Sequence, residues 1–209
     1  MKKEFLKYDT VRNNALKMAH RIYQEGFIPD VIYVSLRGGA YLGNVISEYF
    51  KIVHRRARPV YYAAMVARSY TGIRESDEVK VEGWTYSPDA LRVGDRVLLV
   101  DDIFDSGKTI NHLARMILEK GIPRKDLKVA VHDYKYFYNK AEQLPIQPDY
   151  FCRKHELSVK DEDVWIHYMS HELVGLTSEE LEAHYYSQDP ELREVLQVIA
   201  KDAKDIQKE

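Results

Sequence analysis

The chain has 209 residues, of which 45% are apolar or aromatic and 31% charged, with a net charge of −2 and a pI of about 6.5. These values predict one globular domain with a well-buried core and argue against a basic surface for nucleic acid or anionic membranes. No apolar run approaches a membrane span and the start lacks a secretory pattern, so we expect a cytoplasmic protein. The single cysteine, Cys152, excludes an internal disulfide and is expected to be a packed or surface residue.

Apolar residues alternate between helical spacing and short continuous runs along the chain. Helical spacing predicts helices over residues 10–25, 43–50 and 110–120, and short apolar runs predict strands over 30–35, 60–67, 97–100, 127–131, 150–152 and 164–166. This alternation predicts an α/β fold, a twisted and mainly parallel sheet flanked by helices. Ligands of such sheets bind at the carboxyl ends of the strands.

Two segments fall outside the alternation. Residues 71–88 are charged and rich in turn residues, which predicts a long excursion that serves as a lid or is disordered. From Thr177 onward, a capping box with Glu180 and a proline after Asp189 predict two short helices. We therefore expect a domain over residues 1–175 and a C-terminal helical extension over residues 176–209. An apolar stripe would pack this extension on the domain or on a partner subunit: Leu192, Val195, Leu196 and Ile199.

The most informative segment runs from Val97 to Thr109 and reads Val-Leu-Leu-Val-Asp-Asp-Ile-Phe-Asp-Ser-Gly-Lys-Thr. It joins a buried strand to the start of a helix, where free backbone N–H groups and the helix dipole attract phosphate. Glycine lets the backbone approach a ligand closely, and the loop hydroxyls can add donors. We expect a phosphate-binding loop with carboxylates at its entrance, formed by Ser106, Gly107, Lys108 and Thr109.

Two commoner phosphate motifs do not fit the spacing. A P-loop requires glycine where Asp102 stands, and the glycines at 38, 39 and 43 are wrongly spaced for a dinucleotide fingerprint. A ligand with one phosphate and vicinal hydroxyls fits, because the hydroxyls would bind the carboxylates of Asp101 and Asp102. Ribose 5-phosphate has both groups. A buried strand followed by a solvated turn would explain these residues singly but explains the whole ordered string poorly.

The string resembles the phosphoribosyl-pyrophosphate signature of the type I phosphoribosyltransferases. Residues 32–43, Ile-Tyr-Val-Ser-Leu-Arg-Gly-Gly-Ala-Tyr-Leu-Gly, are similar to the pyrophosphate loop of the 6-oxopurine branch of that family. Arg68-Ser69-Tyr70 resembles the mobile catalytic loop of the same branch, and Lys135 and Trp165-Ile166 match the positions that hold the purine. The likeness spans residues 28–172 and implies a small hood region beside the sheet.

The resemblance implies transfer of the 5-phosphoribosyl group from phosphoribosyl pyrophosphate to a 6-oxopurine, a purine salvage reaction that releases pyrophosphate. It further implies Mg²⁺ bound through Asp101, Asp102 and Glu172, although His171 competes with Glu172 for that position. Arg37, with the backbone of Gly38 and Gly39, would meet the diphosphate. The family also has a non-proline cis peptide in this loop, which corresponds to the bond between residues 36 and 37.

Roles at the reacting centre follow from the same resemblance. Asp105 would act as general base or proton relay for purine N7, or would cap the next helix. Ser69 and Tyr70 would close over the diphosphate and exclude water. Three residues would bind the base: Trp165 by stacking, Ile166 through its backbone, and Lys135 by donating to the 6-oxo group. Trp165 as an ordinary core aromatic and Lys135 as a surface residue are the alternatives.

Other functions also suit the fold. A regulator that senses phosphoribosyl pyrophosphate without catalysis would keep the signature. A transferase for another base, such as orotate or uracil, is a further alternative, to which Lys135 and Trp165 give little support. The mild negative charge and the lack of a recognisable DNA-binding extension disfavour a nucleic-acid regulator. The resemblance also predicts a homodimer.

Overall fold

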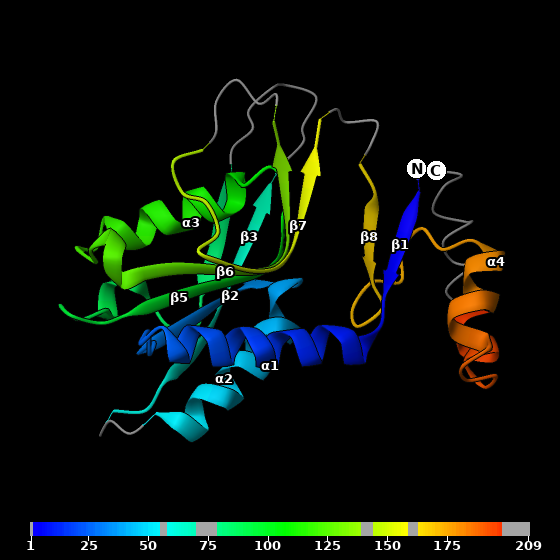
Figure 1. Ribbon diagram of the computed structural model, residues 1–209, viewed down its shortest axis with the longest axis horizontal. Helices are drawn as coiled ribbons and strands as arrows, with labels where there is room; N and C mark the ends of the chain where they lie inside the picture. The colour runs from blue at the N-terminus through cyan, green and yellow to red at the C-terminus, as the bar shows by residue number, and fades with distance from the viewer. Residues whose placement is uncertain (1, 55–57, 70–78, 139–143, 159–162, 198–209) are drawn as a thin grey trace.

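The computed structural model describes residues 2–54, 58–69, 79–138, 144–158 and 163–197, with the backbone alone at positions 68, 69 and 80 (Figure 1). A six-stranded sheet forms the centre, in the order β4-β3-β2-β5-β6-β7. All neighbouring pairs are parallel except β3 and β4. The strands are β2 (Val31–Leu36), β3 (Tyr61–Ser69), β4 (Val79–Trp84), β5 (Val97–Phe104), β6 (Leu127–Phe137) and β7 (Tyr150–Leu157).

Helices cover both faces of this sheet. The helices α1 (Tyr8–Gln24) and α2 (Gly39–Val53) lie on one face, and α3 (Lys108–Leu118) lies on the other (Figure 1). Successive side chains of β2 and β5 enter opposite cores: Ile32 and Leu98 pack under α1 and α2, while Val31 and Val97 pack under α3. Burial on both faces explains why these strands are continuously apolar. Two short 3₁₀ helices, Pro88–Ala90 and Arg124–Asp126, precede β5 and β6.

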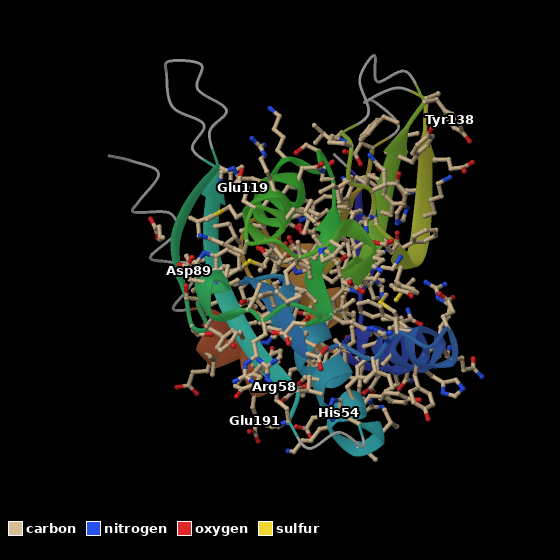
Figure 2. All side chains as sticks on the ribbon, turned by 90° about the vertical axis from the view of Figure 1, so that its left-hand side faces the viewer. His54, Arg58, Asp89, Glu119, Tyr138 and Glu191 are labelled. Atoms are coloured by element: carbon tan, nitrogen blue, oxygen red, sulfur yellow. The ribbon has the colours of Figure 1, made fainter. Side chains whose placement is uncertain are left out.

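The carboxyl ends of the parallel strands share one edge of the sheet. Figure 2 shows Tyr138, which directly follows β6, far from His54 and Arg58, which lie between α2 and the start of β3. The loop after β2 lies against the end of β5, because Gly38 adjoins Asp102, and the end of β6 adjoins the loop after β5, because Lys135 Nζ lies 4.0 Å from Asp105 Oδ1.

A second, smaller unit stands beside the sheet and forms the hood. It contains the parallel pair β1 (Lys3–Leu6) and β8 (Trp165–Tyr168), with α4 (Ser178–Leu181) and a π-helical turn, Glu182–Tyr186, next to them (Figure 1). The capping box at Thr177 is present, since Glu180 N donates to Thr177 Oγ1 at 3.2 Å and Thr177 N donates to Glu180 Oε2 at 2.9 Å. The strands of the hood contact the extension, since Lys3 Nζ lies 2.7 Å from Glu180 Oε2 and His167 Nε2 lies 3.0 Å from the hydroxyl of Tyr185.

Residues 192–197 are helical, as the proline after Asp189 predicts. Leu196 is buried with Tyr185 and Tyr186, and Leu192 is half-buried beside them, whereas Val195 is 58% exposed. The expected stripe therefore packs only in part, and Ile199 lies outside the described residues. The proposed division into residues 1–175 and 176–209 stays a prediction.

The predicted α/β class is confirmed, and each predicted helix and strand is present with shifted ends. The expectation of an irregular excursion over residues 71–88 is wrong for β4, which pairs with β3. There the alternation of Val79 and Val81 with charged residues is a strand pattern that the high charge obscured. The strand β1 was also missed, because it has only four residues and the strand that pairs with it, β8, is distant in the sequence. Within the described residues, no helix is long and apolar enough to cross a membrane.

Candidate active site

The acidic pair belongs to a longer strand than the sequence predicts. β5 continues through Asp101 and Asp102 to Phe104, because β6 also continues to Phe137 and pairs with it, Asp101 opposite Val131 and Ile103 opposite Asp133. Both acids are half-buried. The expectation that the carboxylates follow the strand is corrected: they are the fifth and sixth of its eight residues.

The loop after β2 lies directly against these acids. The bond between Leu36 and Arg37 is cis, as the resemblance implies. A Cβ on Gly39 would lie 2.6 Å from the carbonyl oxygen of Val100, and one on Gly38 would lie 2.3 Å from the carboxyl carbon of Asp102. At Gly39 the nearest atoms are fixed backbone, so only glycine fits there, whereas at Gly38 the nearest atoms belong to the Asp102 side chain. The two glycines therefore bring the backbone of this loop against the end of β5.

The two acids of the pair differ in environment. Asp102 N donates to Asp101 Oδ1 at 3.0 Å, and Ile103 N donates to Asp102 Oδ1 at 2.8 Å. Burial and the adjacent Asp102 carboxylate raise the pKa of Asp101 well above its ordinary value. Asp102 Oδ2 lies 3.3 Å from His171 Nε2. Asp102 is the acid that reaches the neighbouring cleft.

The phosphate-binding loop lies at the start of α3, as predicted. Gly107 has a φ of +76°, and its Cα faces the ring of Phe104 closely enough that a Cβ would lie 2.2 Å from it. Ser106 and Lys108 are exposed and Thr109 is half-buried at the first turn of α3. The helix N-terminus is therefore available to an anion from the same edge that carries the acidic pair.

Asn111 is a buried residue of the first turn of α3, directly after this loop, that the sequence analysis missed. Its Nδ2 donates to Gly107 O at 3.0 Å and to Ile146 O at 2.8 Å, and its Oδ1 accepts from Ile146 N at 2.9 Å. This amide ties the phosphate loop to the segment before β7. An asparagine inside a helical pattern was the only sequence signal.

An open cleft of about 660 Å³ separates the sheet edge from the hood. Arg37, Gly38 and Asp102 form its polar wall, and Trp165 contributes an aromatic wall with 46% of its side chain exposed. The expectation of Trp165 as a core aromatic is thereby excluded. The remaining lining residues come from the hood: Lys3, His171, Glu172, Leu173, Val174 and Gly175.

Both His171 and Glu172 line the cleft, but they have different partners. Glu172 Oε2 accepts from Tyr168 N at 3.2 Å, and His171 is the one closer to Asp102. Burial raises the pKa of Glu172 above its ordinary value, although hydrogen bonds from Tyr168 and Trp165 partly oppose this shift. Among the described residues, no group of three His, Cys, Asp or Glu side chains is arranged to hold a metal ion.

Lys135 lies within β6 rather than after it and is only 8% exposed, so it is no surface residue. Its Nζ lies 2.7 Å from Asp163 Oδ1 and 4.0 Å from Asp105 Oδ1. Lys135, Asp105 and Ser106 line a second, small pocket beside Tyr134. Asp163 was not singled out from the sequence.

The backbone N–H and C=O groups of alternate β8 residues point either toward β1 or away from it. Trp165 N donates to Lys2 O at 3.0 Å, which directs the backbone of Trp165 toward β1. Alternate residues of a strand point their N–H and C=O groups to opposite sides, so those of Ile166 point away from β1. The Ile166 side chain is buried in the core beneath α1 and α2.

Two predicted residues cannot be compared with the structure in full. Ser69 ends β3 and pairs with Val79, but its side chain is not described, and Tyr70 lies outside the described residues.

Cys152 is half-buried. Its burial, and to a smaller extent the nearby charge of Asp133, raise the pKa of the thiol to about 12, as expected for an unreactive thiol.

This geometry, a doubly covered parallel sheet with an acidic pair between two anion-binding loops, defines a ribose-phosphate-binding class. Residues 4–171 match the family described as the phosphoribosyl transferase domain. That match covers most of the chain, so the chain belongs to this family of enzymes. The predicted resemblance to the phosphoribosyltransferases is thereby confirmed.

Three solved structures have the same fold at low identity. A purine phosphoribosyltransferase from Pyrococcus horikoshii has a TM-score of 0.63 and 20% identity over 85% of this chain and 99% of its own. A hypothetical protein from Neisseria gonorrhoeae with bound ppGpp has a TM-score of 0.61 and 23% identity over 83% and 92%. The Helicobacter pylori xanthine-guanine-hypoxanthine phosphoribosyltransferase has a TM-score of 0.54 and 19% identity over 87% and 99%. No curated protein matches the sequence.

Proposed function

We propose that this protein transfers the 5-phosphoribosyl group from phosphoribosyl pyrophosphate to a 6-oxopurine base. One observation carries the proposal: two anion-binding elements flank the acidic pair at one sheet edge. The backbone of Gly38 and Gly39 lies against Asp101 and Asp102 on one side, and the N-terminus of α3 follows on the other. A donor with a diphosphate and a 5-phosphate on one ribose requires this order of groups.

The proposed base site contains two opposite charges, since Lys135 Nζ lies 4.0 Å from Asp105 Oδ1. A free 6-oxopurine whose imidazole proton lies on N7 presents a donor, N7–H, beside the acceptor O6. Lys135 would donate to O6, and Asp105 would take up or relay the proton of N7 as the new bond forms at N9. The exposed face of Trp165 supports stacking, and the outward backbone groups of Ile166 support reading of the purine edge.

Each residue has a defined part in the reaction. Arg37 would stabilise the negative charge that grows on the departing pyrophosphate, since it is exposed on the cleft wall. Asp105 would receive or relay a proton. Ser69 and Tyr70 would close over the diphosphate and exclude water, a role that rests on the family resemblance alone.

The carboxylates fit magnesium chemistry. Asp102 and Glu172 line the same cleft and offer hard oxygen ligands, and Mg²⁺ in proteins takes few carboxylates together with substrate oxygens. Asp101, Asp102 and Glu172 would hold the ion with the oxygens of the donor, and the bound ion would offset charge on the pyrophosphate. The lack of a preformed three-ligand group in the described chain suits an ion that arrives with its substrate.

The test is a panel of bases with phosphoribosyl pyrophosphate and magnesium chloride, followed by chromatography of nucleotides and assay of pyrophosphate. Hypoxanthine, guanine or xanthine should give nucleotide, and adenine, orotate and uracil should not. Product from orotate or uracil alone would assign a transferase for another base. Tight binding of the donor with no product from any base would favour a regulator.

Two further expectations accompany this proposal. A homodimer, predicted from the family, would be measured by light scattering at several concentrations. The proposed purine salvage role fits a cytoplasmic protein, which fractionation of the source cells would test.

A further inference from the structure

The ammonium group of Lys135 lies between two carboxylates. Its Nζ is 2.7 Å from Asp163 Oδ1 and 4.0 Å from Asp105 Oδ1. The exposed fraction rises across the three side chains, from 8% for Lys135 to 24% for Asp163 and 59% for Asp105. They come from β6, from the segment before β8 and from the loop after β5, so only the tertiary fold brings them together.

The pair of Lys135 and Asp163 is largely withdrawn from water. Removing two charges from water costs free energy that their attraction often fails to recover, so a buried ion pair is weak evidence for a role in stability. Lys135 also lies near Asp105, the proposed proton acceptor. Asp163 precedes Trp165, the proposed stacking residue, by two positions in the sequence. Its position therefore points to the base rather than to the core.

The edge of a free 6-oxopurine with its imidazole proton on N7 presents three groups in order: N7–H donates, O6 accepts and N1–H donates. Adenine presents N7 as acceptor, the 6-amino group as donor and N1 as acceptor. A protein edge that reads the first order needs a donor opposite O6 and an acceptor on either side of it. An ammonium supplies donors only, and an ionised carboxylate supplies acceptors only.

We propose that Asp163 is a specificity-determining residue that accepts a hydrogen bond from N1–H of the purine, beside the contact of Lys135 with O6. This inference rests on the proposed function, because it requires a 6-oxopurine at Lys135. O6 and N1 belong to neighbouring positions of the ring, so their partners must be neighbours as well, and the 2.7 Å contact meets that condition. Asp105, Lys135 and Asp163 would then read N7, O6 and N1 in turn.

This arrangement rejects adenine at two positions. At position 6 the ammonium would face an amino group, and at position 1 the carboxylate would face a lone pair. A buried polar group left without a partner is the strongest source of discrimination between similar substrates.

The experiment compares Asp163→Ala and Asp163→Asn with the wild type, using hypoxanthine, 1-methylhypoxanthine and adenine. Asp163→Ala should lower kcat/KM for hypoxanthine on the order of 10-fold or more. It should leave 1-methylhypoxanthine unchanged, because that base has no N1–H to donate. Asp163→Asn keeps an acceptor oxygen and gains a donor, so it should retain more hypoxanthine activity and reduce the discrimination against adenine.

Asp89→Ala is the matched control. Asp89 forms an exposed Asp–Lys ion pair with Lys120 at 2.6 Å, and Figure 2 shows Asp89 well away from the β6 end marked by Tyr138. This variant should keep the base preference of the wild type. Donor affinity, measured by calorimetry, should stay within 2-fold of the wild type in all three variants.

Two results would overturn the inference, and they are distinguishable. Equal losses for hypoxanthine and 1-methylhypoxanthine in Asp163→Ala and Asp163→Asn, with hypoxanthine still a substrate, would show that Asp163 only positions Lys135. Absence of product from every base with the wild type would overturn the proposed function and this inference together.

Discussion

The hydroxyl of Tyr168 donates to Asp133 Oδ2 at 2.5 Å, and this hydroxyl also lies 3.0 Å from the carbonyl oxygen of Asp102. Tyr168 belongs to β8 of the hood, whereas Asp133 and Asp102 belong to neighbouring strands of the sheet. One side chain therefore connects the hood to the backbone of the acidic pair.

Asp133 is the centre of this connection. It is completely buried and accepts from His132 Nδ1, Arg153 Nε and His155 Nε2, each at 2.6 Å. Burial acts against the charged form, but hydrogen bonds from His132, Tyr168 and His155 outweigh it and hold the pKa of Asp133 below its ordinary value.

Asp133→Asn should destabilise the protein at neutral pH by roughly 3 kcal/mol, because it leaves buried donors of a charge network without their acceptor. A lowered pKa stabilises the folded state above the unfolded value of about 4, and this stability is lost as the pH falls through the folded value. The difference between variant and wild type should therefore shrink below about pH 4. Urea unfolding at pH 7, 5 and 3 measures it.

Glu182→Gln is the control for that series, since Glu182 forms an exposed pair with Arg193. Its effect should stay below about 1 kcal/mol at each pH. A loss in Asp133→Asn that is equal at pH 7 and pH 3 would contradict a role for the Asp133 charge.

Asp102→Asn should weaken binding of phosphoribosyl pyrophosphate on the order of 10-fold, a loss expected for a charged partner of the ligand. The double variant with Asp101→Asn should bind more weakly still and remain folded, since carboxylates at a strand end serve the ligand rather than the core. Calorimetric titration with magnesium present is the measurement. Wild-type affinity in the double variant would refute the role of the pair.

Asp105→Asn should lower kcat by about 10²–10⁴-fold if Asp105 serves as the base, with little change in donor affinity. The side chain is 59% exposed, so the substitution should leave the fold unaffected. Rapid-quench kinetics and donor titration separate the two quantities. Equal losses of turnover and of donor affinity would instead identify a binding or capping residue.

Trp165→Ala and Lys135→Ala should separate stacking from edge recognition. Loss of the indole should raise KM for every purine by about 5–150-fold, the range expected for one stacked base. Loss of the ammonium should reduce use of 6-oxopurines while donor binding stays unchanged. A wild type that prefers adenine, or unchanged purine kinetics in Lys135→Ala, would contradict the 6-oxopurine assignment.

The order of residues along the chain is enough to predict the strands and the phosphate loop. The apolar runs predict the strands because both faces of the sheet are covered, and the string from Val97 to Thr109 predicts the phosphate loop because a strand, a glycine and a helix start are consecutive. The family could be recognised for the same reason: its signature residues are neighbours in sequence.

The tertiary structure decided what depends on distant residues. β1 exists because β8 pairs with it, and β4 exists because β3 offers an edge. The contact of Lys135 with Asp163 crosses 28 positions, and that of Tyr168 with Asp102 crosses 66. No periodicity encodes such pairs, because the spacing of side chains along one strand carries no information on which strand lies beside it.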